Sequence, residues 1–323
     1  MIFDENYIIF LQKLTKEKLQ SIIDDYNQLS NIFNFDKVDT KKMKKNDIIS
    51  KIIEIKEEYL RYFVMSLDKQ DYEILKNCLS RKVKNDYLNE KRDFIKYMLN
   101  KNLIFQEDNL IIPRDIYMCL INFLKEKEIS KYIEKWDRIY KLVDGIIIAY
   151  GAIDRKYFDI IISGIEDNKL IIPKLEYYYK KDYAIDNKKI VSLKLTNKKR
   201  INNYLKNTNY KMFKNSDFVA MADSKFHHNI KSYKKFIKML KSNYIFKNND
   251  IKFVDQKIVI PYLYNSLNEE EIAKNNLIDT ITTLFEFKSD KLKNKMLEEI
   301  VKIRDEFPLL EYRGFSKNEV KDE

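Results

Sequence analysis

The stretch LIFQEDNLIIP, residues 103–113, is the clearest guide to how this chain folds. Two short apolar runs flank the polar turn EDN, which predicts a β-hairpin that ends at Pro113. Upstream of it, apolar spacing predicts a helix capped by Ser66 or Asp68 and a second helix beginning near Leu88. Helix, helix, hairpin is the order of a winged-helix module, whose second helix can lie in a groove while the hairpin touches the adjacent backbone.

Similar elements extend outward in both directions. Before the hairpin, helical spacing predicts two helices joined by a polar loop, the first of them capped by Thr15. After it, a helix ending at Gly151, a helix from Asp154 and the runs YAI and IVSL about DNKK predict a second winged-helix-like unit. A basic helix followed by IKFV, DQK and IVIP predicts a third, shorter version with its own hairpin, and two amphipathic helices follow.

Glycine and proline, four residues each, are too scarce for a fold rich in special turns. The expected fold is therefore mainly α with small β-hairpins (α+β): tandem winged-helix-like modules after an N-terminal helix-loop-helix, with a C-terminal helical segment. The predicted segments are a helix-loop-helix at 1–57, winged-helix-like units at 58–130 and 131–200, a basic helix plus hairpin at 201–265, and C-terminal helices and a tail at 266–323.

A family resemblance rests on three short stretches. Leu14-Thr15, Leu19 and MKKNDIISKIIE, within residues 14–56, resemble the small helix-loop-helix modules of the SAP and Rho N-terminal type, in which a basic pair precedes the second helix. Together with the AYGAI turn at 149–153 and the closing RGFSKNEV, they resemble a group of uncharacterised Firmicutes proteins that place such a module ahead of winged-helix-like regions. Some members carry a SEC-C zinc motif, whose cysteines this sequence lacks. The resemblance implies an architecture and the binding of nucleic acid or protein, with no catalytic residue to transfer.

The overall sequence excludes several classes of protein. Cys78 and Cys119 are too few for a disulfide framework or a cysteine-rich zinc site. The N-terminus lacks the features of a signal peptide. The longest uncharged stretch, residues 145–153, has nine residues, whereas roughly 20 are needed to span a bilayer. We therefore expect a cytoplasmic protein with no membrane partner.

Positive charge is concentrated in one part of the chain. Of 61 Lys and Arg and 50 Asp and Glu, residues 180–260 hold 20 and 6, which leaves 41 and 44 elsewhere. A basic segment threaded with Tyr and Phe is typical of a polyanion-binding surface, because cations neutralise phosphates and bases stack on aromatic rings. The alternative is a solvated basic face, since 52 lysines against 9 arginines indicate AT-rich codon usage.

The predicted nucleic-acid-binding residues fall on several segments. On the basic helix of the third, shorter unit, four lysines share a face opposite the apolar residues: Lys231, Lys234, Lys235 and Lys238. Lysine favours phosphate contact over bidentate recognition of guanine, so weak sequence selectivity is expected. The others lie in the second hairpin's turn, in the KKR run after it and around the second helix of the first winged unit: Lys188, Lys189, Lys198, Lys199, Arg200, Lys82, Lys84, Lys91 and Arg92.

No set of residues identifies a reaction, a cofactor or a metal site. The four glycines are isolated, so the chain has no phosphate-binding glycine loop. His227 and His228, the only histidines, are adjacent, and neighbours on a helix diverge by about 100°. We therefore do not expect them to share a metal ion, but expect one to be packed inside and the other exposed.

The sequence thus predicts a non-catalytic protein that binds DNA or RNA through winged-helix-like modules and a lysine-rich face, without a cofactor. Two alternatives stay open. One is a scaffold that binds a protein partner through apolar faces. The other is a cryptic metal-dependent nuclease of phage defence or mobile elements, which would need carboxylates converging on a divalent ion.

Overall fold

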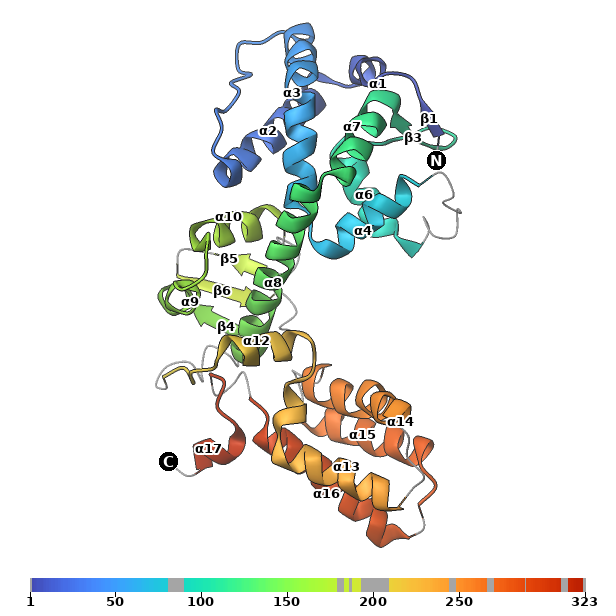
Figure 1. The fold of residues 1–323 in the computed structure, drawn as a ribbon, viewed down its shortest axis with the longest axis vertical. Helices are drawn as coiled ribbons and strands as arrows, with labels where there is room; N and C mark the ends of the chain where they lie inside the picture. The colour runs from blue at the N-terminus through green and yellow to red at the C-terminus, as the bar shows by residue number, and fades with distance from the viewer. Residues whose placement is uncertain are drawn as a thin grey trace. The chain divides into compact units, whose positions relative to one another are not determined.

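The computed structural model describes residues 2–80, 90–178, 183–185, 188–192, 209–243, 248–265, 270–287, 289–308 and 313–321. The chain divides into two compact units. The N-terminal unit comprises Met1–Asp137 and Glu166–Lys180, and the C-terminal unit comprises Arg138–Ile165 and Lys181–Glu323. Each unit is mainly helical and contains one three-stranded sheet (Figure 1). The expected fold class, mainly α with small β-hairpins, is therefore confirmed.

The N-terminal unit contains the predicted first hairpin. Strand β2 (Phe105–Gln106) pairs antiparallel with β3 (Leu110–Pro113), and β1 (Ile2–Asp4) pairs with the other edge of β3 in parallel. The sequence did not predict this parallel strand. The helices of the unit are α1 (Tyr7–Lys13), α2 (Lys16–Phe33), α3 (Lys45–Ser66), α4 (Lys69–Cys78), α6 (Arg92–Asn100), α7 (Arg114–Lys125) and α10 (Asn168–Tyr178), together with the first part of α8 (Lys127–Tyr150).

Local capping explains where the predicted helices begin. The Thr15 hydroxyl accepts a hydrogen bond from the Lys18 backbone N–H at the start of α2. The Asp68 carboxylate accepts one from the Asp71 backbone N–H at the start of α4. Helices α2 and α3 form the predicted helix-loop-helix, and α4, α6 and the β2–β3 hairpin follow in the predicted order.

A buried acid lies in the core of the N-terminal unit. Asp25 on α2 accepts hydrogen bonds from the hydroxyls of Tyr59, at 2.8 Å, and Tyr177, at 3.0 Å, and it pairs with the Lys101 ammonium. Burial raises the pKa of Tyr59 well above its ordinary value, and the nearby charge of Asp25 raises it further. Burial likewise raises the pKa of Tyr177 well above its ordinary value. Both phenols therefore remain protonated donors to the carboxylate.

The first part of the C-terminal unit contains the predicted second hairpin. Strands β5 (Tyr183–Ile185) and β6 (Lys189–Ser192) pair antiparallel, and β4 (Ala152–Asp154) pairs antiparallel with the other edge of β6. Helix α8 ends at Tyr150 and is followed by Gly151, whose φ of 65° suits glycine, as predicted. Helices α9 (Arg155–Ile162) and α12 (Asn215–Ala222) complete this part. Gly145 permits close packing of α8 on α12, because a Cβ there would lie 1.8 Å from the Phe218 carbonyl oxygen.

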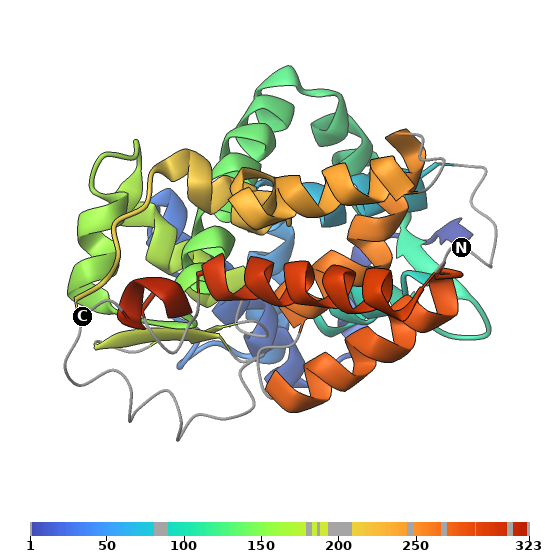
Figure 2. The same ribbon diagram turned by 90° about the horizontal axis from the view of Figure 1, so that it is seen from below.

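The elements described in the rest of the C-terminal unit are all helical. They are η1 (Phe226–Asn229), α13 (Lys231–Asn243), α14 (Asn248–Val254), η2 (Asp255–Val259), η3 (Pro261–Asn265), α15 (Glu270–Leu284), α16 (Asp290–Glu306) and α17 (Lys317–Lys321). Helices α13 and α16 lie side by side (Figures 1 and 2) and share a core that includes Phe236, Leu240 and Ile300. Within the described ranges, no helix combines the length and the apolar character needed to cross a membrane.

The prediction of a third hairpin within 201–265 is wrong. The runs IKFV and IVIP lie in α14, η2 and η3, all helical. The buried residues Val254, Ile258 and Tyr262 recur every four positions and pack in one cluster with residues of α13 and α16. A short apolar run is compatible with a buried strand or a buried helix, and tertiary packing selects the helix here.

The predicted segment 131–200 is divided between the two units. Helix α10 belongs to the N-terminal unit, whereas α9 and the strands β4, β5 and β6 belong to the C-terminal unit. The five predicted segment boundaries therefore stay predictions, and the compact units are the better guide to which residues pack together.

Candidate nucleic-acid interface

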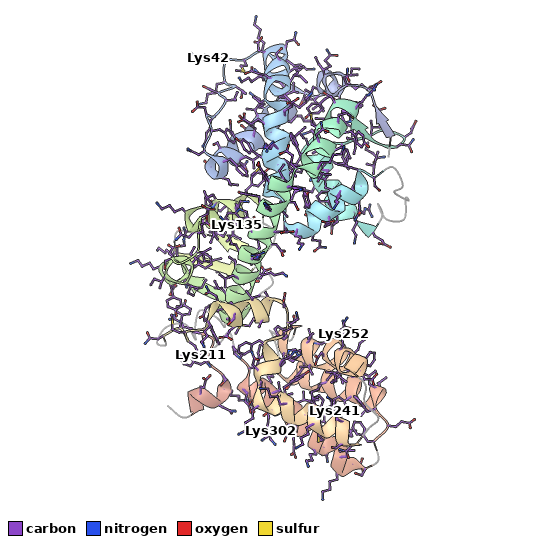
Figure 3. All side chains as sticks on the ribbon, viewed as in Figure 1. Lys42, Lys135, Lys211, Lys241, Lys252 and Lys302 are labelled. Atoms are coloured by element: carbon purple, nitrogen blue, oxygen red, sulfur yellow. The ribbon has the colours of Figure 1, made fainter. Side chains whose placement is uncertain are left out.

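Five exposed lysines form one side of α13, here called the lysine face: Lys231, Lys234, Lys235, Lys238 and Lys241. At about 100° per residue they fall within an arc of about 120°. The opposite arc carries the buried side chains of Tyr233, Phe236 and Leu240. Figure 3 labels Lys241 on α13 and Lys302 on the neighbouring α16. The predicted common face of the first four lysines is thus present, and Lys241 extends it.

Contacts on the buried side of α13 fix its orientation. The Ser232 backbone N–H and hydroxyl both donate to the Glu306 carboxylate on α16, the N–H at 3.3 Å. The Tyr233 hydroxyl donates to Asp255 Oδ1 at 2.8 Å. Because these polar contacts and the apolar core hold one side of the helix, the lysine face is presented to solvent.

The charges of the lysine face are not neutralised by described residues. Across the part of the chain that the structure describes, no carboxylate lies within 4.0 Å of any of these five ammonium groups. Elsewhere lysines do find partners, such as Lys302 with Glu299 at 2.9 Å. Like charges on one exposed face create a positive potential that attracts a polyanion and is screened by salt.

The other predicted residues are spread over the molecule. Lys188 and Lys189 are in the C-terminal unit at the start of β6, where the Lys188 carbonyl accepts a hydrogen bond from the Arg155 backbone N–H at 2.7 Å. Lys91 and the exposed Arg92 begin α6 of the N-terminal unit. Five predicted residues lie outside the described ranges: Lys82, Lys84, Lys198, Lys199 and Arg200. Among the predicted residues that the structure describes, only the α13 lysines form an extended face.

Sequence reasoning missed Lys241 although a signal for it exists. Lys231, Lys234, Lys238 and Lys241 follow spacings of three, four and three, the pattern of one helical face. The helix continues to Asn243, so this fifth lysine belongs to the same face.

A second polar group, here called the His–Asp cluster, is formed by residues of η1, which precedes α13, and of η2, which follows α14. His227 and His228 on η1 and Asp255 on η2 each bring one donor atom within 4.8 Å of the others. The Nε2 atoms of His228 and His227 are 2.9 Å and 3.4 Å from the Asp255 carboxylate oxygens. The His227 side chain is fully buried and that of His228 is 46% exposed, as predicted.

The expectation that the side chains of His227 and His228 diverge is not met, whereas the expectation that they share no metal ion stays a prediction. Their ring centroids are 4.4 Å apart, and both rings reach Asp255. The backbone directions diverge, but the side chains turn toward one carboxylate that the sequence places 27 residues after His228. Sequence spacing gave no signal of that meeting.

The electrostatics of the His–Asp cluster favour a charged carboxylate. Burial raises the pKa of Asp255, but its contacts with His227, His228 and Tyr233 outweigh burial and hold the pKa below its ordinary value. His227 Nε2 makes no hydrogen bond to described residues although it is buried. Leaving such a group unsatisfied costs about 1–3 kcal/mol.

Comparisons with protein-family models, with curated proteins and with solved structures found no match to this chain. The resemblance of residues 14–56 to SAP and Rho N-terminal modules, and of the chain to the Firmicutes group, therefore stays a prediction.

Proposed function

We propose that this protein binds DNA or RNA without catalysis, in the cytoplasm, and that the lysine face contacts phosphates. The main observation in support of this proposal is that five exposed lysines share one side of α13 with no carboxylate partner among the described residues. From Lys231 to Lys241 the helix rises about 15 Å. One strand of a duplex carries about four phosphates over that length, so the spacing of charges on the two molecules is similar.

The helix, helix, hairpin order of the N-terminal unit supports a second contact. In a winged-helix module the second helix enters a groove, and here that helix is α6, which begins at Lys91 and Arg92. Because lysine contacts phosphates as a point charge, the lysine face would contribute affinity with little sequence selectivity.

The test is a salt titration of binding. A variant with Lys231, Lys234, Lys235 and Lys238 replaced by glutamine is compared with the wild type, using fluorescence anisotropy of labelled duplex DNA, single-stranded DNA and RNA. Each lysine–phosphate contact contributes about one unit to the slope of log affinity against log salt, so the variant should bind more weakly with a slope smaller by about four.

The matched control removes the same charge from the same unit. Lys252, Lys291, Lys295 and Lys302 are exposed lysines outside the lysine face. Replacing these four by glutamine should change the slope by less than about one. Equal losses in both variants would show that net charge, and not the face, drives binding. Undiminished binding by the α13 variant would reject the proposed site, and no binding of the wild type to any of the three nucleic acids would reject the proposed function.

A further inference from the structure

The His–Asp cluster has the donor set of a metal site. It brings two imidazole nitrogens and one carboxylate together from η1 and η2. Imidazole donors suit Zn²⁺ and its transition-metal neighbours, whereas Mg²⁺ and Ca²⁺ prefer oxygen ligands throughout. Among the described residues this is the one group of at least three His, Cys, Asp or Glu whose donor atoms converge in this way.

An unsatisfied buried nitrogen points to a ligand. The His227 side chain is fully buried, and its Nε2 has no hydrogen-bond partner in the described structure. Its other ring nitrogen, Nδ1, lies 3.5 Å from the Tyr264 hydroxyl. A metal-ligating histidine characteristically donates from its second nitrogen to a nearby oxygen, which leaves the first with a free lone pair. In the tautomer whose Nδ1–H is directed at Tyr264, Nε2 would present its lone pair to the cluster.

The spacing of one donor pair fits a small tetrahedral ion, and all three donor atoms lie within 4.8 Å of one another. Zinc bonds of about 2.0–2.1 Å at tetrahedral angles separate neighbouring ligand atoms by about 3.3 Å. His227 Nε2 and Asp255 Oδ1 are 3.4 Å apart. The Tyr233 hydroxyl donates to Asp255 Oδ1 and so orients the carboxylate from outside the donor set.

We propose that His227, His228 and Asp255 bind one divalent transition-metal ion, with Zn²⁺ the best fit. Three protein ligands leave one tetrahedral position, and the exposure of His228 places that position near solvent, where water or an anionic ligand would complete the site. The ion would join η1, which leads into α13, to η2. The proposed metal site does not depend on nucleic-acid binding, so evidence against one proposal would not be evidence against the other.

The test uses the full chain without an affinity tag, after treatment with a chelator. Co²⁺ and Zn²⁺ are titrated separately, Co²⁺ by visible absorption and Zn²⁺ by calorimetry. The expected result is one ion per chain, and intense visible Co²⁺ bands from a tetrahedral site. Because the chain has only two histidines, no other imidazole can produce a nitrogen-ligated signal.

Two variants locate the site. His228→Gln removes a half-exposed ligand and should weaken Zn²⁺ binding by more than about 100-fold, since even the loss of an outer partner costs about 10–100-fold. Asp250→Asn, a change to a carboxylate five residues before Asp255, should bind like the wild type. A wild-type chain that takes up neither ion stoichiometrically, or a His228→Gln variant with unchanged affinity and intact circular dichroism, would overturn the proposal and leave the cluster as a hydrogen-bonded network.

Discussion

Lysines occupy contrasting environments in the N-terminal unit and on α13 of the C-terminal unit. In the N-terminal unit, Lys56 pairs with Asp115 at 2.6 Å, Lys101 pairs with the buried Asp25, and Lys174 is itself only 1% exposed. The lysine face of α13 is exposed and has no carboxylate partner among the described residues. One residue type is therefore paired or buried at these positions of one unit and presents its charge to solvent on α13 of the other.

The contrast shows why a count of charges is a weak guide to function. A lysine whose charge is already neutralised adds little to the potential felt by a partner, whereas an unpaired exposed lysine adds its full charge. The difference lies in the partner and the burial of each ammonium group, and both depend on tertiary structure.

The largest expected effect is a loss of stability when Asp25, the buried acid of the N-terminal unit, is replaced. Asp25→Ala leaves Lys101 without its partner and two tyrosine hydroxyls without their acceptor, which should reduce the free energy of unfolding of this unit by about 3–5 kcal/mol. Trp136, the only tryptophan, is fully buried in the same unit, so urea unfolding followed by its fluorescence reports this loss.

The neighbouring acid provides the control for Asp25. Asp24 is exposed on the same helix, and Asp24→Ala should change the free energy of unfolding by no more than about 0.5 kcal/mol. If both variants unfold at the same urea concentration, the charges of the N-terminal unit are not structural and the contrast between the units fails.

An intermediate effect is expected at Lys174, which has an apolar and aromatic environment. Its ammonium nitrogen lies 4.1 Å from the Trp136 ring centroid and 4.5 Å from that of Tyr132, and it donates to the Met65 carbonyl at 3.3 Å. Burial lowers the pKa of Lys174 well below its ordinary value of 10.5, with Asp167 opposing the shift. Its neutral form is therefore favoured in the folded chain.

The lowered pKa of Lys174 makes stability depend on pH. As the pH falls below 10.5, the unfolded chain takes up a proton before the folded chain does, so this lysine lowers the free energy of unfolding by up to about 1.4 kcal/mol per pH unit until its folded pKa is reached. Lys174→Met should therefore be more stable than the wild type at pH 7, with the difference shrinking toward pH 10. Urea midpoints from Trp136 fluorescence at pH 7, 8, 9 and 10 measure it.

An exposed lysine on the same helix isolates the effect of burial at Lys174. Lys169 lies in α10 with its side chain exposed, and Lys169→Met should keep the wild-type pH profile. Parallel profiles for the wild type and Lys174→Met would show that Lys174 remains charged in the folded unit and that the aromatic rings compensate for its burial.

Local patterns predicted much of the fold. Helical spacing and the caps at Thr15 and Asp68 gave the helices, and the apolar runs on either side of EDN gave the first hairpin. The lysine face was predictable because all its members lie on one helix, where spacing alone determines the face. These features depend on interactions between residues close in sequence.

Features that depend on distant residues were not predictable. Strand β1 pairs with β3, whose residues lie more than a hundred positions later, and Asp255 meets His227 and His228 from another element. The IKFV and IVIP runs satisfy both strand and helix patterns, and only the packing of Ile258 and Tyr262 against a helical core resolves them. Such contacts leave no periodic signal in the sequence.

The smallest effect is expected on the lysine face itself and concerns stability. Lys234 and Lys238 are four residues apart on α13, and like charges at this spacing destabilise a helix by about 0.2–0.5 kcal/mol per pair. Lys234→Gln combined with Lys238→Gln should therefore raise the melting temperature slightly at low salt. Thermal unfolding followed by far-UV circular dichroism at 10 mM and 500 mM salt measures the change, which should disappear at high salt because the Debye length shortens.

Replacing a paired lysine on the neighbouring helix should change the melting temperature in the opposite direction. Lys302 on α16 lies 2.9 Å from Glu299, so Lys302→Gln removes an attraction and should lower the melting temperature slightly at low salt. Opposite signs for the two variants would establish that α13 retains its charges at a cost to stability, as expected of a surface kept for a polyanionic partner. A loss of stability in the α13 variant would instead mean that its lysines are paired in solution, and the contrast between the two units would disappear.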